Sequence, residues 1–154
     1  MAIYGLQQVF EESVSAVTAT PSVQLGTERW EGGRKYIYMY NKSTSTASTK
    51  FGVVYSASSG YSMTISSVVG EQLAGVVVNA DIPTVNYGWV CVKGHVAVTS
   101  DTATAPVAGG KLICGDLGYM TMPSGGTSWT GMVAGVVTAG TAATATFAAF
   151  INVG

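Results

Sequence analysis

The 154-residue sequence is unusually poor in charge. Lys, Arg, Asp and Glu make up 10% of it, where a typical globular chain has about 25%. The seven basic residues are scattered and the net charge is -1, so we expect no nucleic-acid partner. No apolar run approaches the ~18 residues needed to span a bilayer, so no membrane association is expected either. Such a sparsely charged, near-neutral surface favours a chain that is covered by other polypeptides.

Residues that could carry catalysis are equally scarce. His95 is the only histidine, no Gly-x-Ser-x-Gly elbow accompanies it, and a half-buried structural role is expected for it. One histidine with two separated cysteines lacks the spacing of a zinc site, and the acids fall mostly at turns. We therefore expect no enzyme, no metal and no cofactor. An enzyme of unrecognised geometry is the alternative, and it requires His95 within reach of a carboxylate and a hydroxyl.

The two cysteines, Cys91 and Cys114, are predicted to be buried and reduced. The N-terminus lacks a basic region followed by an apolar run, so no secretory signal is expected.

After Pro21 the pattern indicates an all-β domain. Residues 34–41 alternate strictly and follow Gly32-Gly33, which predicts a hairpin from a strand over residues 23–30. Residues 41–50 predict a polar surface loop, and further strands are expected at 51–55, 61–69 and 73–78. The strands are short and separated by Gly-rich turns. This predicts a compact β-barrel or β-sandwich of antiparallel strands over residues 21–154.

The most informative stretch is the long predicted strand 87–99. Strict alternation predicts Val90, Val92, Val96 and Val98 on one face, with Gly94 marking a bulge or a close backbone approach. Residues 74–77 recur as residues 134–137, and Trp89 is matched by Phe147. Two strand-turn-strand units in one barrel or sandwich are therefore expected.

Residues 1–20 carry apolar positions at a spacing that suits one face of a short helix. Two interpretations remain open: a helix on the domain's own core, or an arm that reaches a neighbouring molecule. The arm interpretation predicts that Ile3, Leu6, Val9 and Phe10 contact a partner.

The aromatic residues also allow two interpretations. Tyr36, Tyr38 and Tyr40 share one strand face, and with Trp30 they could form a platform for sugar rings. Alternatively, they pack in the core or between subunits, where tyrosine offers area and one hydrogen bond. We favour packing, and take Trp30, Trp89 and the three tyrosines as candidate contacts to a partner or between subunits.

Several segments together resemble the head decoration (cement) proteins of tailed bacteriophages. The resemblance spans residues 25–154 and rests on Leu25-Gly26-Thr27, Gly33-Arg34-Lys35-Tyr36, Gly88 to Gly94, Gly135-Val136 and Phe147 to Val153. It implies a homotrimeric, β-rich structural virion protein on the capsid exterior, assembled in the host cytoplasm. Its partner would be the major capsid protein, whose subunits it would clamp together.

Two further alternatives compete with this resemblance. The first is a phage fibre or tail module, or another glycan-binding β module, that uses the aromatic stripe. The second is a secreted carbohydrate-binding module, which ranks lower because no signal sequence or disulfide framework is predicted.

Overall fold

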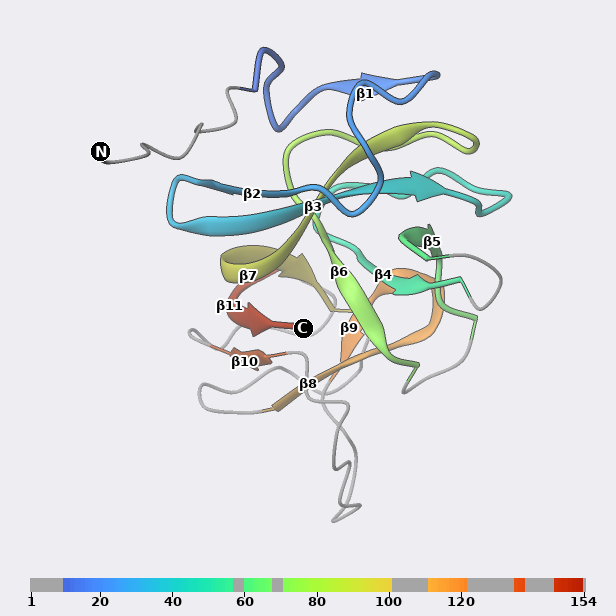
Figure 1. Ribbon diagram of the computed structural model, residues 1–154. Helices are drawn as coiled ribbons and strands as arrows, with labels where there is room; N and C mark the ends of the chain where they lie inside the picture. The colour runs from blue at the N-terminus through green and yellow to red at the C-terminus, as the bar shows by residue number, and fades with distance from the viewer. Residues whose placement is uncertain are drawn as a thin grey trace, which may run out of the picture.

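A computed structural model describes residues 10–56, 60–67, 71–100, 111–121, 135–137 and 146–153, the backbone alone at 135–137. Within these residues the chain is all-β, as predicted, and contains no α-helix. Figure 1 shows the strands, which in chain order are β1 (Val17–Thr18), β2 (Glu28–Glu31), β3 (Arg34–Asn41), β4 (Gly52–Tyr55), β5 (Ser62–Thr64), β6 (Leu73–Val77), β7 (Tyr87–Thr99), β8 (Lys111–Cys114), β9 (Met120–Thr121), β10 (Gly135–Val137) and β11 (Thr146–Asn152). A 3-10 turn, η1 (Asp116–Gly118), joins β8 to β9.

Five strands close into a barrel. β3 pairs with β5, β5 with β4, β4 with β6, β6 with β7, and β7 pairs back to β3. Strand direction cannot alternate around a ring of five, so at least one pair must be parallel. That pair is β3–β5, and the other four are antiparallel. Because the ring is closed, each of these five strands pairs with a neighbour on both sides.

The strand β7 continues beyond the barrel into a second group of strands. Its residues 93–99 pair with β11, which is followed by β10, β8 and β9. Figure 1 shows β8, β10 and β11 in orange and red in the lower part of the view, and β1 and β2 in blue in the upper part. β6–β7 and β10–β11 are both antiparallel pairs of consecutive strands, as the repeat predicts, and the predicted turn of the second unit lies outside the described residues.

A bulge marks the point where β7 leaves the barrel. Lys35 pairs with Lys93 but Tyr36 pairs with Cys91, so one extra residue lies on β7. Gly94 adopts φ +126, and a Cβ there would lie 3.0 Å from Gly33 O and from Arg34 Cγ. Gly94 is therefore both a site of positive φ and a close backbone approach, as predicted.

The prediction of one continuous valine face along β7 is wrong. Val90 and Val92 belong to one hydrophobic cluster, whereas Val96 and Val98 belong to the other cluster, together with Trp89 and Cys91. The physical reason is the bulge, because one extra residue exchanges the two faces of a strand. For the same reason His95 is exposed and not half-buried.

Two hydrophobic clusters result, one inside the barrel and one outside it. The inner cluster takes side chains from all five barrel strands: Ile37, Met39, Val53, Met63, Ala74, Val77, Val90 and Val92, joined by Ala47 and Ile82. The outer cluster lies between the barrel and the strands β8, β9 and β11, and it includes Tyr36, Tyr38, Trp89, Cys91, Val96, Val98, Leu112, Cys114, Met120, Phe147 and Ile151. The predicted alternation of β3 is confirmed, with its isoleucine and methionine inside and its tyrosines outside.

The expectation of a helix over residues 1–20 is wrong for the part that is described. Residues 10–20 contain the short strand β1, where Val17 pairs with Gly88 and Thr18 with Tyr87. Phe10 and Val14 pack against the outer cluster, and Val17 packs against the inner one. This segment lies on the domain's own core, as one of the two interpretations proposed, but it is extended. Ile3, Leu6 and Val9 lie outside the described residues.

The expected strand over residues 23–30 is also shorter than predicted, since β2 begins at Glu28. Upstream, Gly26 has φ +83 and Thr27 N–H donates to Gln24 O, so a turn replaces the strand. The predicted hairpin turn at Gly32-Gly33 is confirmed, with φ values of +58 and +75.

Candidate functional site

The tyrosine stripe is packed against other parts of the same chain. Tyr36 is 2% exposed, Tyr38 0% and Trp89 2%. Tyr40 is partly buried, and its ring lies 4.9 Å from that of Tyr87. The side chains of Tyr36, Tyr38 and Trp89 therefore cannot serve as partner contacts in this fold, because they are already buried in it. An exposed sugar platform along this stripe is excluded for the same reason.

The segment from Phe10 to Ser22 covers the rings of Tyr38 and Trp89. The Tyr38 hydroxyl lies 3.0 Å from Thr18 Oγ1 and 3.0 Å from Ser22 Oγ. Ser22 Oγ donates to Glu12 Oε1 at 2.7 Å, and Trp89 Nε1 donates to the same oxygen at 3.2 Å. Every polar atom of these two rings thus has a partner on the covering segment, as buried polar groups require.

Arg29 on β2 completes this arrangement. Its NH1 donates to Glu12 O at 2.6 Å, and its guanidinium also pairs with Glu31. The guanidinium carbon lies 4.9 Å from the centre of the Phe10 ring and 5.7 Å from that of Trp89. Phe10 meets Trp89 edge-to-face at 5.4 Å. We name this group the clasp: Phe10, Glu12, Ser22, Arg29, Tyr38 and Trp89.

The clasp determines where the N-terminal segment meets the barrel. Aromatic packing, cation–π contact and charge-assisted hydrogen bonds converge on Phe10 and Glu12. Both residues contact Arg29, so the first described residues of the chain lie beside β2. Among the predicted arm contacts, Phe10 is thereby assigned to the domain's own surface.

That hairpin carries the most exposed aromatic residue of the described part of the chain. Trp30 on β2 is 63% exposed. Its neighbours are charged: Lys35 Nζ lies 2.7 Å from Glu28 Oε1, and Arg29 pairs with Glu31. Residues 28–35 hold five of the 15 formally charged residues in the sequence. An exposed tryptophan with charged residues around it is typical of a hot spot in a protein interface.

A second group of exposed rings was missed by the sequence analysis. Tyr55 on β4 is 40% exposed and Tyr61, just before β5, is 43% exposed. Burial and the nearby Tyr61 raise the pKa of Tyr55. The Tyr61 ring packs over Gly26, where a Cβ would lie only 2.3 Å from it. The sequence signal that could have identified these two rings is a tyrosine on each side of the Ser/Gly-rich stretch 56–60.

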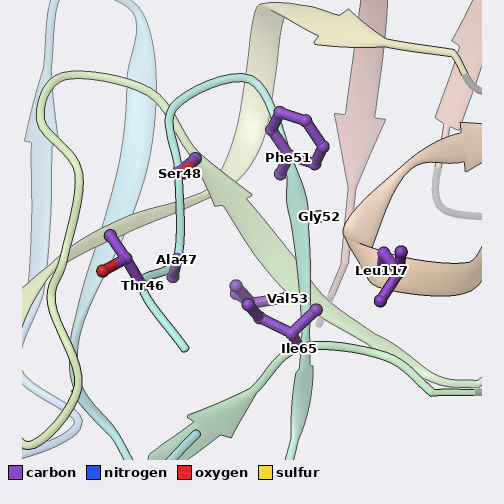
Figure 2. Close-up of a pocket in the computed structure, with 8 residues that line it drawn as sticks. All are labelled: Thr46, Ala47, Ser48, Phe51, Gly52, Val53, Ile65 and Leu117. Carbon is purple, nitrogen blue, oxygen red and sulfur yellow. The ribbon is translucent and has the colours of Figure 1, made fainter. Parts of the chain in front are cut away.

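Figure 2 shows a small pocket between the loop 46–48, β4 and the 3-10 turn. Its volume is about 80 Å³, and it is lined by Thr46, Ala47, Ser48, Phe51, Gly52, Val53, Ile65 and Leu117. Leu117 stands opposite the β4 side of the pocket in Figure 2 and is 63% exposed, with φ +54. Small-molecule sites usually measure about 300–1,000 Å³. This pocket has room for one aliphatic side chain.

His95 lies on an exposed face of β7. The His95 ring packs against Phe150 at 5.1 Å, and its backbone carbonyl accepts a bond from Arg34 Nε at 2.6 Å. In the ranges that the structure describes, no three His, Cys, Asp or Glu residues gather as metal ligands would. Nor do those ranges contain a helix with the length and apolar character needed to cross a bilayer.

Cys91 and Cys114 are both buried and free, as predicted. Burial is the main cause that raises the pKa of each thiol to about 11.

Comparison with solved structures finds a similar fold. The crystal structure of the N base of head fiber gp8.5 in bacteriophage phi29 superposes with a TM-score of 0.55 at 12% sequence identity. The match covers 76% of this chain and 94% of that one. At this identity the likeness concerns the fold alone. No protein-family model matches the sequence, and no curated protein matches it.

Proposed function

We propose that this chain is a non-enzymatic structural protein of a phage particle, which binds the outer surface of the capsid and stabilises contacts between major capsid subunits. The observation that carries the proposal is the fold shared with the base of a phage head fiber over 76% of the chain. The resemblance to head decoration proteins rests on the sequence and not on the fold, and it points to the same part of a virion.

The surface chemistry is consistent with such a role. A capsid-bound protein acts by burying area against several subunits at once, so each copy stabilises the shell by mass action. Few charges must be desolvated when such a surface is covered, since only 10% of the residues are charged. A homotrimer, as the resemblance implies, would triple the number of contacts.

The direct test is co-sedimentation of the purified chain with empty shells of the phage that encodes it. We expect saturable binding, and a higher temperature of shell disruption when the chain is bound. A variant that lacks residues 1–9 but keeps the clasp should bind less while its circular dichroism is unchanged. Failure of the full chain to bind shells, or binding without any gain in shell stability, contradicts the proposal.

A second candidate function is recognition of a glycan by a fibre or tail module. The rings of Tyr55 and Tyr61 favour it, because they are exposed and could stack on a sugar ring, whereas Tyr36 and Tyr38 are buried. A glycan array with the wild-type chain and the Tyr61→Ala variant tests this function. Binding that the variant loses supports it, and the absence of any glycan signal contradicts it.

A further inference from the structure

The strand β2 forms an open edge of the sheet. It stands at one end of the pairing order, and within the described ranges it pairs only with β3. Tyr38 N–H donates to Thr27 O at 3.0 Å, so Thr27 directs its backbone toward β3. Backbone direction alternates along an antiparallel strand, so Arg29 and Glu31 also face β3. Glu28 and Trp30 then direct their N–H and C=O groups outward.

These outward groups are unused within the described part of the chain, where the N–H and C=O of Glu28 and Trp30 have no hydrogen-bond partner. The Trp30 side chain at the centre of this edge is 63% exposed. An edge with free backbone groups and an exposed aromatic residue can accept another strand.

We propose that the strand added to this edge is β2 of a second copy of the chain, antiparallel and centred on Trp30. In this register the N–H and C=O of Trp30 exchange two hydrogen bonds with those of Trp30 in the second copy. Arg29 of each copy lies opposite Glu31 of the other, and Glu28 lies opposite Gly32.

Charge selects this register over its neighbours. A pairing centred on Arg29 would place the two arginines opposite each other. A pairing centred between Arg29 and Trp30 is excluded by backbone direction, because it would set the outward-facing Glu28 against Glu31, which faces β3. Like charges directly opposite each other destabilise a sheet, whereas opposite charges stabilise it by about 0.2–1 kcal/mol per pair. Among the registers in which outward-facing residues meet outward-facing residues, only the one centred on Trp30 pairs every facing charge of β2 with an opposite charge or with glycine.

This contact is a two-fold one and is separate from binding to a shell. An isologous pair cannot by itself build a trimer. If the chain is a homotrimer through other surfaces, the β2 contact would link one trimer to the next. The test therefore uses the isolated chain and reports on the edge alone.

The first experiment is a cross-link at the centre of the edge. Facing residues of a hydrogen-bonded antiparallel pair have Cα atoms about 5.5 Å apart, a separation that a disulfide spans. Trp30→Cys should therefore give a covalent dimer under mild oxidation. Glu28→Cys is the matched control, because its copies would stand roughly 13 Å apart, four residues along the strand. The native Cys91 and Cys114 are buried and do not interfere.

The second experiment measures association by sedimentation velocity. Glu31→Arg places arginines opposite Arg29 at both ends of the contact, so self-association should weaken about tenfold or more. Asp116→Arg makes the same charge change at an exposed position of the 3-10 turn η1, and it should leave association unchanged.

A dimer formed by Trp30→Cys and not by Glu28→Cys, together with loss of association in Glu31→Arg alone, supports the proposal. Equal cross-linking by both cysteine variants, or none by either, overturns it. It also fails if Trp30→Ala abolishes shell binding while neither cysteine variant cross-links, because the edge then belongs to the shell contact.

Discussion

Replacing Gly94 by alanine is expected to be among the most destabilising small changes in this fold. Gly94 stands where β7 passes from the barrel to the second group of strands, with φ +126. An alanine Cβ would lie 3.0 Å from Gly33 O and 3.2 Å from Arg34 Cα. Both neighbours are backbone atoms of the β2–β3 hairpin, so they cannot move aside as a flexible side chain would.

Two costs add at this position. Holding a non-glycine residue at such a φ costs about 1–3 kcal/mol, and forcing backbone atoms apart costs about 1–3 kcal/mol. Reduced freedom of the unfolded chain returns about 0.4–1 kcal/mol. The free energy of unfolding should therefore fall by about 3 kcal/mol, a large part of the 5–15 kcal/mol typical of a domain.

Gly32→Ala is the matched control. Gly32 also has positive φ, at +58, but a Cβ there would meet no atom within 4 Å. Only the left-handed conformation is then unfavourable, at about 1–2 kcal/mol before the gain from the unfolded chain. We expect a net loss of about 1 kcal/mol.

Urea unfolding followed by circular dichroism measures both variants, with equal m-values as the sign that the transition is unchanged. If Gly94→Ala costs no more than Gly32→Ala, the close approach at the bulge does not constrain the fold and the reasoning is refuted.

Three further predictions concern the clasp, the thiols and the 3-10 turn. Tyr38→Phe removes the hydroxyl next to Thr18 and Ser22. It should lower the free energy of unfolding by about 1–2 kcal/mol, as measured in urea, and an unchanged midpoint would contradict the clasp. Burial raises the pKa of Cys91 from its ordinary value of 9.0 to about 11, so its thiol should resist a thiol reagent at pH 8 until the chain unfolds. As pH rises, the unfolded chain loses the Cys91 proton at a lower pH than the folded chain does. The protonated thiol therefore makes its full contribution to the free energy of unfolding below about pH 9, and this contribution is lost as the pH rises to about 11. A native thiol that reacts at the unfolded rate would contradict this. Leu117→Gly relieves a left-handed leucine that is 63% exposed, so the thermal midpoint should stay equal or rise slightly, and a large fall would show that Leu117 supports the pocket.

Much of the fold could be predicted because it depends on local patterns. Residues 34–41 and 87–99 alternate along their length, and both are strands with those bounds. Glycine pairs and polar runs mark the turns between them. Both cysteines were predicted to be buried and reduced because no secretory signal is expected, and both are buried and free.

The errors arose where a local pattern met a long-range contact. Residues 10–20 have helical spacing, yet they form β1 and the clasp because Tyr38 and Trp89, distant in sequence, offer an aromatic surface to cover. Packing of the tyrosine stripe was predicted without deciding between the core and a subunit contact. The fold buries Tyr36 and Tyr38 within the domain itself, with Thr18 and Ser22 over the Tyr38 hydroxyl.

Composition and alternation alone therefore decided that this chain is an all-β protein, sparsely charged and built from short strands with glycine turns. These properties depend only on the composition and the order of the residues, because alternation along a strand does not depend on which strands become its neighbours. The closure of five strands into a ring, the exchange of faces at Gly94 and the exposure of Trp30 were decided by tertiary structure. Each of them depends on which distant segment lies across a strand, and a one-residue bulge is enough to turn a buried face outward.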